Sequence, residues 1–471
     1  MMSLSKGSST TALTLRRSRY LPHYLKKSLS TVSNGWNPGI SFANLTDVGM
    51  RRANNQDSYA CLHADSEARF HQRGHLFVVA DGMGAHAAGE LASKMATERI
   101  AMQYFRSDDE DPVDALRKAV IEANSEIHRR GQQNPEFHNM GTTASALAIL
   151  PEGAVIAHVG DSRVYRLRSG TFEQLTFDHS LVWEMQASGQ VHPDSVLGKS
   201  IPKNVITRSL GPNAEVAVDV EGPHAIRKGD VFLLCSDGLT GEVDDTEIAV
   251  LVDCLPETKA ARVLVDLANL RGGPDNSTVV IVRVTDDLSS QPQARAAKSA
   301  TASPVSPVLV GTSVVCFLVS IGLFAASLYE ANTLGMAVVS GVLGMIAGAV
   351  ALIQFMTSPS SVDSPKRSGF SGGKGPYRRY SGAATLQLCE RLGATVDALR
   401  DAAAQQSWEI CWDEIDQHQA RAREALGQSD PKAAVSHQAE AILETMQQLR
   451  DQKAGETLTE DDDEDDETID L

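Results

Sequence analysis

Four short motifs rich in aspartate, asparagine and glycine recur within the first 290 residues, and three of them lie against strongly apolar runs typical of β-strands. The motifs are Asn54-Asn55-Gln56-Asp57, Asp81-Gly82-Met83-Gly84, Ser236-Asp237-Gly238 and Gly273-Pro274-Asp275-Asn276. An isolated Asp-Gly pair is usually a turn, because both residues tolerate the backbone angles that turns require. Several carboxylates gathered by one sheet instead form a site for hard divalent cations, which prefer oxygen ligands. The pattern therefore predicts a divalent-metal site, with simple turns as the alternative.

The elements that would position these motifs lie in residues 40–288, where strand-like and helix-like patterns are dense. Strands are predicted at 40–45, 75–80, 143–149, 154–159, 164–168, 231–235 and 278–284. Helices are predicted at 87–104, 112–130, 180–187, 245–254 and 257–270. Because the strands come in clusters rather than in strict alternation with helices, the order favours an α+β domain with antiparallel sheets faced by helices.

Composition excludes some classes of function. The net charge of −17 argues against a general nucleic-acid binder, although much of that charge lies in residues 460–470. The six cysteines are far apart and form no Cys-x-x-Cys pair, so we expect reduced thiols rather than zinc ligands or disulfides.

A membrane hairpin is predicted at residues 308–356. Its two apolar stretches, 308–328 and 334–356, are each about 30 Å long as helices, which is enough to cross a bilayer. Buried core helices are the alternative. Lysine and arginine flank the hairpin on both sides, which predicts that both flanks face the cytoplasm. Membrane localisation follows, with the domain at 40–288 and the C-terminus in the cytoplasm.

The remaining segments are predicted from composition. Residues 1–39 are basic, rich in serine and free of acids, which indicates either a disordered arm or a mitochondrial presequence. Residues 289–307 and 357–383 read as linkers. Residues 384–453 are predicted to be a helical module for a protein partner, in which Gly427 ends one helix and Asp430-Pro431 begins the next. Residues 454–471 read as an acidic disordered tail.

Taken in order, the motifs of the first domain resemble those of the metal-dependent serine/threonine protein phosphatases of type 2C, in their bacterial form. The resemblance covers residues 40–286 and excludes the hairpin and the C-terminal module. Beyond the four motifs above, it includes Arg52, Met140-Gly141-Thr142-Thr143, His158-Val159-Gly160-Asp161-Ser162-Arg163 and Ile206-Thr207-Arg208-Ser209-Leu210-Gly211. Seven such motifs in family order are specific. The resemblance implies a four-layer α-β-β-α sandwich of two antiparallel sheets flanked by helices.

The resemblance also implies the site. Two Mn²⁺ or Mg²⁺ ions would activate water and stabilise the anionic oxygens of a phosphate ester. Asp81 would bridge the two ions with help from the Gly82 carbonyl. Asp237 and Asp275 would complete the coordination of the first ion. Asp57 would hold coordinated waters. Arg52 would clamp the substrate phosphate with its guanidinium, and the Asp161 carboxylate would help to hold a third, weaker ion.

Alternatives to these roles stay open. Arg52 could be an ordinary surface cation, and Asp161 could make a local hydrogen bond without binding metal. Gln56 stands where the family pattern has a glutamate that contacts the second metal, so we expect weaker binding of that ion. Residues 176–190 match the variable flap of the family, which is a plausible contact for the protein substrate.

The leading hypothesis is a membrane-anchored protein serine/threonine phosphatase that acts on phosphoproteins and opposes a cognate protein kinase. The expected compartment is the bacterial inner membrane, with a mitochondrial membrane as the alternative. A second hypothesis is a weakly active scaffold that binds phosphoproteins through Arg52, suggested by Gln56 and the additional C-terminal module. A third is the related branch that acts on anti-sigma antagonist proteins, which Arg52 and the 160–163 segment disfavour.

Overall fold

The computed structural model describes residues 36–84, 87–109, 111–192, 195, 200–202, 205–288 and 377–464, with side chains to residue 452. All of them belong to one compact unit, made of residues 1–290 and 372–471. The predicted hairpin at 308–356 and the linker at 289–307 lie outside the described residues, as do residues 1–35 of the predicted arm.

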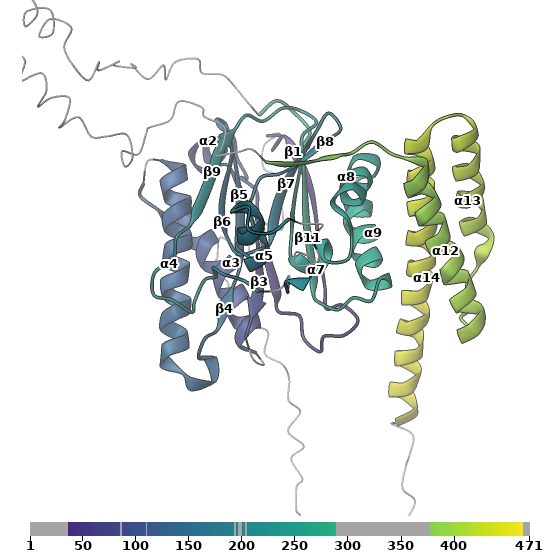
Figure 1. Ribbon diagram of the computed structural model, residues 1–471, viewed down its shortest axis with the longest axis horizontal. Coiled ribbons are helices and arrows are strands. Elements are labelled where there is room, and N and C mark those ends of the chain that lie inside the picture. Colours follow the sequence, from purple (N-terminus) through teal and green to yellow (C-terminus); the bar gives the residue numbers. More distant parts are fainter. Residues whose placement is uncertain are drawn as a thin grey trace, which may run out of the picture. The chain divides into compact units, whose positions relative to one another are not determined.

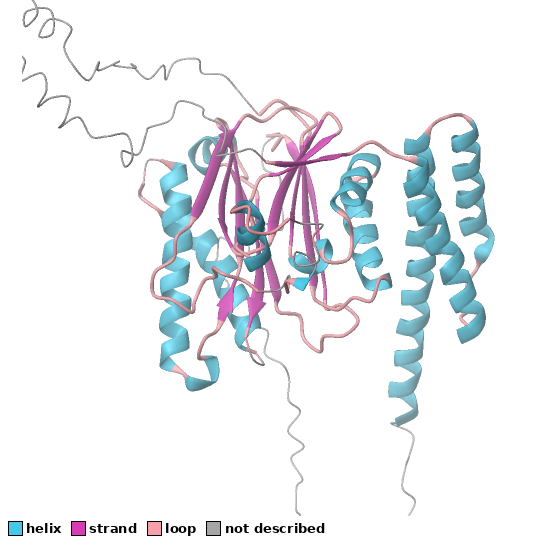
Figure 2. Ribbon diagram, viewed as in Figure 1, coloured by secondary structure: helices cyan, strands magenta, loops and turns pink. Residues whose placement is uncertain are grey.

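Two antiparallel sheets form the centre of this unit (Figures 1 and 2). The first has the order β2-β3-β5-β6-β9, with β4 paired to β3, and the second has the order β1-β11-β10-β7-β8-β12. Strands of the first sheet are β2 (Asp57–Leu62), β3 (His75–Met83), β4 (Gly141–Thr142), β5 (Ala144–Leu150), β6 (Gly153–Val159) and β9 (Asp219–His224). Strands of the second are β1 (Ile40–Asp47), β7 (Arg163–Arg168), β8 (Thr171–Gln174), β10 (Val231–Cys235), β11 (Ser277–Val284) and β12 (Arg378–Ser381).

Helices cover the outer face of each sheet, and an apolar layer lies between the sheets (Figure 2). Helices α3 (Ala88–Arg106) and α4 (Pro112–Gln133) pack on the first sheet, while α8 (Asp245–Cys254) and α9 (Glu257–Leu270) pack on the second. Phe77 and Leu147 from the first sheet meet Phe232 and Val280 from the second, all fully buried. The predicted α+β class with two antiparallel sheets and flanking helices is confirmed.

Predicted and observed elements agree closely where apolar periodicity is strong. The bounds of β10, α8 and α9 equal the predicted ones, because apolar runs or stripes end there at polar residues. Several short elements were not predicted: β2, β8, β9, α2 (Glu67–Arg73), η2 (Pro135–Phe137) and α7 (Asp237–Thr240). The domain also begins before residue 40, since the Trp36 ring packs against Phe70 and His75.

The C-terminal region forms three helices beside α8 and α9: α12 (Leu386–Gln406), α13 (Trp412–Gly427) and α14 (Pro431–Glu464). As predicted, Gly427 ends α13, and Asp430 caps α14 by accepting a 3.0 Å hydrogen bond from the Ala433 amide. Buried apolar residues of α12 and α14, such as Leu392 and Val435, join the core of the second sheet's helices. Lys432 on α14 also pairs with Asp253 on α8 at 2.8 Å.

Two predicted boundaries in this region are wrong. The linker at 357–383 contains strand β12, which pairs with β8 at the edge of the second sheet. The tail at 454–471 contains the end of α14, which runs to Glu464. In both places a neighbouring element overrides weak local composition: the open edge of β8 recruits a polar strand, and a formed helix extends at little cost per residue.

In the part of the chain that the structure describes, no helix is long and apolar enough to span a membrane.

Candidate metal centre

The ends of paired strands bring the predicted aspartates together. Asp57 at the start of β2 stands directly opposite Asp81 near the end of β3. Asp237 opens α7 directly after β10, and Asp275 precedes β11, the neighbour of β10. A 2.7 Å hydrogen bond from the Ser236 hydroxyl to Asp57 joins the two sheets at this point. The fold therefore brings Asp57, Asp81 and Asp237 together, with Asp275 next to them.

The electrostatics of this cluster are those of uncompensated negative charge. Burial, with the nearby carboxylates of Asp237 and Asp275, raises the pKa of Asp57 to about 7 despite its hydrogen bond from Ser236. Burial and the neighbouring aspartates also raise the pKa of Asp81 well above its usual range. Burial raises the pKa of Asp237, which shares a hydrogen bond with Asp81. Oδ1 of Asp57 and Oδ1 of Asp237 are buried without a hydrogen-bond partner.

Asp161 belongs to the same cluster. Burial, followed by the charges of Asp237 and Asp178, raises its pKa to about 8, and its buried Oδ1 has no hydrogen-bond partner. Thr143 ties Asp161 to Asp81: its hydroxyl accepts a 2.8 Å bond from the Asp81 amide and lies 2.7 Å from the hydroxyl of Ser162. The preceding Gly160 has a φ of +114°, and a Cβ there would lie 2.5 Å from Thr143. The chain can therefore turn Asp161 toward the cluster only with glycine at residue 160.

Arg52 lies at the exposed side of the cluster. Its Nη2 pairs with Oδ2 of Asp275 at 2.8 Å, and its Nε donates to the Pro274 carbonyl at 3.3 Å. Its side chain is 47% exposed, so the guanidinium keeps donors that face solvent. Arg52 thus lies at the surface of the protein beside an aspartate of the predicted site.

Gly82 and Gln56 pack against the start of α3. A Cβ on Gly82 would lie 2.1 Å from the Gly89 carbonyl oxygen and 2.6 Å from that of Gln56, so only glycine fits. The side-chain nitrogen Nε2 of Gln56 lies 3.5 Å from the Gly84 carbonyl oxygen. A Cβ on Gly89 would lie 2.8 Å from the same nitrogen. The structure thus places Gln56 beside the cluster with its side-chain nitrogen directed at Gly84.

Three polar residues of the site belong to the sequence motifs, but the sequence alone indicates no role for them: Thr143, Ser236 and Asn276. Asn276 accepts a 2.8 Å bond from the Gln56 amide and donates to the carbonyls of Val48 and Asn54. It thereby fixes the segment that carries Arg52 and Asp57. The only signal in the sequence was their place beside the aspartates. His158 is buried between the Ser145 hydroxyl and the Phe177 carbonyl.

The donor chemistry of this cluster fits hard divalent cations. Within the described residues, no three His, Cys, Asp or Glu side chains stand as a ready-made group around one ion. The Asp81–Asp237 hydrogen bond and the Arg52–Asp275 ion pair already engage part of the carboxylate oxygens. Three buried carboxylate oxygens of Asp57, Asp161 and Asp237 nevertheless lack partners, and an oxygen-only set is what Mn²⁺ and Mg²⁺ select. Side chains adjust more readily than the backbone that carries them, so these oxygens can turn toward an ion.

Comparison with known proteins decides the family. A family model described as protein phosphatase 2C matches residues 50–267. The protein phosphatase PhpP of Streptococcus pneumoniae is 37% identical over 248 residues, which cover 52% of this chain and 97% of PhpP. The chain belongs to the protein phosphatase 2C family. It is accordingly a metal-dependent serine/threonine protein phosphatase, as the motifs predict.

Other members of the family extend the comparison. The serine/threonine protein phosphatase PstP of Mycobacterium tuberculosis is 36% identical over 253 residues, or 52% of this chain and 45% of PstP. A crystal structure of that protein has 33% identity and a TM-score of 0.47, covering 52% of this chain and 99% of the solved one. A structure of the PstP catalytic domain with 2 manganese ions has 33% identity and a TM-score of 0.45, covering 52% of this chain and 99% of the solved one.

Proposed function

We propose that this phosphatase hydrolyses phosphoserine and phosphothreonine in proteins with water activated at a centre of two Mn²⁺ or Mg²⁺ ions. The observation that carries the proposal is the group of aspartates at strand ends, three of which have a buried carboxylate oxygen without a partner, beside the half-exposed Arg52. When bound, such ions lower the pKa of a coordinated water and neutralise charge on the phosphoryl oxygens.

The residues of the chain have separate tasks in this proposal. Asp81, Asp237 and Asp275 would hold the ions, with the carbonyl of Gly82, whose close approach to Gly89 requires glycine. Asp57, held by Ser236, would accept hydrogen bonds from coordinated waters and so orient the attacking water.

Two further residues complete the proposed centre. Arg52 would exchange its contact with Asp275 for the substrate phosphate, which its planar guanidinium can bind through two donors. Asp161 would contribute to a third, weaker ion site, supported by its buried, unpartnered Oδ1.

Phosphate release from a phosphothreonine peptide by the full chain with Mn²⁺ tests this function. EDTA is expected to abolish release, and Asp237→Asn to lower kcat/KM by about 10³-fold, as for the loss of a main electrostatic group. Asp114→Asn is the matched control, because this carboxylate is exposed on α4 and pairs with Arg117 three residues later. Release that survives both EDTA and Asp237→Asn would remove the proposal.

Ion binding has its own readout, independent of turnover. Mn²⁺ should raise the unfolding temperature of the wild-type chain and of Asp114→Asn, because a ligand that binds only the folded state stabilises it. Asp237→Asn should lose most of this shift. An equal shift in all three proteins would place the ion elsewhere.

We further propose that the enzyme is anchored in a membrane by residues 308–356, with its catalytic domain in the cytoplasm, where it opposes a protein kinase. The support is the sequence: two apolar stretches long enough to span, with basic flanks on the same side. Anchoring would raise the effective concentration of the enzyme near membrane-bound phosphoproteins.

A fluorescent fusion with and without residues 1–39 tests this location. Recovery in the membrane fraction is expected for both forms. Recovery in the soluble fraction would contradict anchoring, and mitochondrial import that depends on residues 1–39 would replace the bacterial inner membrane by the alternative. The binding of a protein partner by the C-terminal helices stays a prediction.

A further inference from the structure

Strand β12 presents its side chains alternately to two different surroundings, as a strand must. Arg379 points to one side and pairs with Glu173 on β8 at 2.7 Å. Arg378 and Tyr380 share the other side, where Tyr380 contacts Asp245 at the start of α8 and Arg378 contacts α5 (Leu181–Ala187). This short strand lies about 190 residues after α5 in sequence. One of its arginines, Arg379, contacts the sheet, and the preceding one, Arg378, contacts helix α5.

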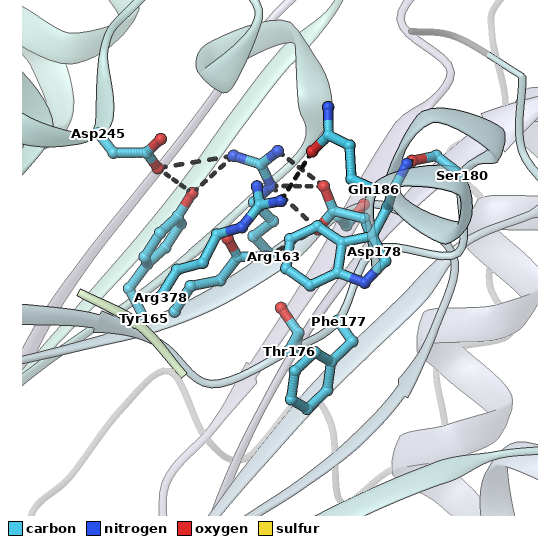
Figure 3. A network of polar contacts seen from close by, with 12 residues as sticks. Arg163, Tyr165, Thr176, Phe177, Asp178, Ser180, Gln186, Asp245 and Arg378 are labelled. Carbon is cyan, nitrogen blue, oxygen red and sulfur yellow. Dashed lines mark hydrogen bonds and ion pairs between the residues drawn. The ribbon is translucent and has the colours of Figure 1, made fainter. Parts of the chain in front are cut away.

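Arg378 holds helix α5 by two contacts. Its guanidinium lies 3.7 Å from the centre of the Trp183 ring, and its Nη2 donates to the Gln186 side-chain oxygen at 3.1 Å. Figure 3 shows Arg378 reaching across to Gln186 beside the buried pair of Arg163 and Asp178. None of the residues of α5 is buried, so packing alone gives this helix little support.

Helix α5 is joined at its start to the carboxylate cluster. Its N-cap, Ser180, directly follows Asp178 and His179. The His179 amide donates to the Gly160 carbonyl at 2.7 Å, and the Gly160 amide donates to Nδ1 of His179 at 2.9 Å. Gly160 precedes Asp161, and the Asp178 carboxylate helps to raise the pKa of Asp161. Helix α5 therefore begins beside the proposed reaction centre, while its later residues 183 and 186, which Arg378 contacts, lie farther along the helix.

The side chains of α5 suit contact with a polypeptide. Leu181, Val182, Trp183 and Met185 are all half-exposed, which gives an apolar surface next to the cluster. Through Gly160 and Asp161, the start of α5 lies beside the carboxylate cluster that a phosphorylated residue would reach.

We propose that Arg378 is a positioning residue that fixes α5 as the contact surface for the polypeptide around the phosphorylated residue, and so sets the preference for protein substrates. The inference rests on the proposed function, since α5 matters only if the aspartate cluster is the reaction centre. Residues 377–381 then complete the catalytic domain, although they follow the predicted hairpin in sequence.

The test compares three variants of the full chain, Arg378→Ala, Arg378→Lys and Arg379→Ala, on two substrates. The substrates are a phosphothreonine peptide and a small aryl phosphate, which has no flanking chain for α5 to contact. Arg378→Ala should raise KM for the peptide by about three- to tenfold, the scale of one cation–π contact and one hydrogen bond. The kcat and KM of this variant for the aryl phosphate should stay within about twofold of the wild-type values.

The controls separate positioning from strand stability. Arg378→Lys keeps a cation over Trp183 and should recover most of the peptide KM, whereas Arg379→Ala removes an ion pair from the same strand and should leave both substrates unchanged. Hydrogen exchange at residues 181–187 should accelerate in Arg378→Ala and not in Arg379→Ala.

Equal loss in both alanine variants, or an unchanged peptide KM in Arg378→Ala, would overturn the proposal. A wild-type chain inactive on both substrates would instead refute the phosphatase centre itself. If Arg378→Ala does not fold, Gln186→Ala replaces it, with a smaller rise in peptide KM expected and none if the proposal is wrong.

Discussion

Two buried charged clusters lie side by side in this molecule and differ in how their charges are balanced. In the first, burial raises the pKa of Asp57, Asp81, Asp161 and Asp237, nearby carboxylates add to each shift, and three of these aspartates have a carboxylate oxygen without a partner. The second cluster is centred on Arg163, two residues after Asp161. The side chains around the Arg163 guanidinium accept its hydrogen bonds.

The second cluster is complete within the protein. Arg163 donates to both oxygens of Asp178, at 2.7 to 3.0 Å, and to the Tyr165 hydroxyl at 3.0 Å. Tyr165 in turn donates to Asp245 at 2.5 Å (Figure 3). A balanced buried cluster can serve the fold by itself, whereas an unbalanced one needs a charge that the protein does not supply. The difference marks the first cluster as functional and the second as support.

The largest effect on stability should come from breaking the balanced cluster. Asp178→Asn removes the main carboxylate partner of Arg163, leaves only the longer 3.5 Å pair with Asp245, and should lower the free energy of unfolding by about 3 kcal/mol, because a largely buried charge without good compensation is costly. Asp237→Asn removes like charge from the unbalanced cluster and should leave stability unchanged or raise it by about 1 kcal/mol in metal-free buffer. Urea denaturation of both variants measures the contrast.

Asp65→Asn is the control for this pair. It removes an exposed partner of Arg69 on the same chain, and should cost no more than about 0.5 kcal/mol. Equal destabilisation by Asp178→Asn and Asp237→Asn would erase the distinction between the two clusters.

A third kind of buried group is kept neutral, and it gives a pH dependence. Burial lowers the pKa of His75 to about 4, while its Nδ1 accepts a bond from the Ala64 amide and its Nε2 lies 3.1 Å from the Pro38 carbonyl. The unfolded chain, with a histidine pKa near 6.5, binds a proton more readily than the folded one between pH 6.5 and 4. Stability is therefore lost as the pH falls through this window, by about 2 kcal/mol from pH 7 to 5 for this residue alone.

His75→Phe isolates that contribution. The variant loses two hydrogen bonds and should be less stable at pH 7, but its stability should change less with pH than that of the wild type. Urea midpoints at pH 7 and 5 give the difference between the two slopes, in which the other titrating groups cancel. Parallel slopes would mean that the pKa of His75 is the same in the folded and unfolded states.

Much of this architecture follows from the sequence because apolar runs are long and regular. Strands β10 and β11 and helices α8 and α9 show this, and so do the aspartates, which stand where such runs end. Strand β12 could not be found in the same way. Its sequence, Arg378-Arg379-Tyr380-Ser381, has no apolar alternation, and its pairing depends on the open edge of β8, more than 190 residues earlier.

The strength of the local sequence signal also explains why a role could be predicted for some site residues and not for others. A carboxylate beside an apolar strand is conspicuous, since burial of a charge demands a reason. Uncharged Thr143, Ser236 and Asn276 are common in loops and turns, and only the folded structure shows them holding Asp81, Asp57 and the Arg52 segment. Arg378 had no local signal, because its partners Trp183 and Gln186 are distant in sequence.

The smallest effect is expected at Gln56, which lies at the border of the unbalanced cluster. Its side-chain nitrogen faces the Gly84 carbonyl, so a glutamate there would turn a carboxylate toward the first turn of α3, where unpaired backbone amides favour negative charge. The added charge should strengthen ion binding, and Gln56→Glu should lower the Mn²⁺ concentration for half-maximal phosphate release by about three- to tenfold. Glu90→Gln, which changes an exposed carboxylate in the first turn of the same helix, is the matched control. A rise in maximal rate of more than tenfold would instead favour the weakly active scaffold, because it would show that the natural glutamine disables the enzyme. No change in Mn²⁺ dependence would show that Gln56 lies outside the ion site.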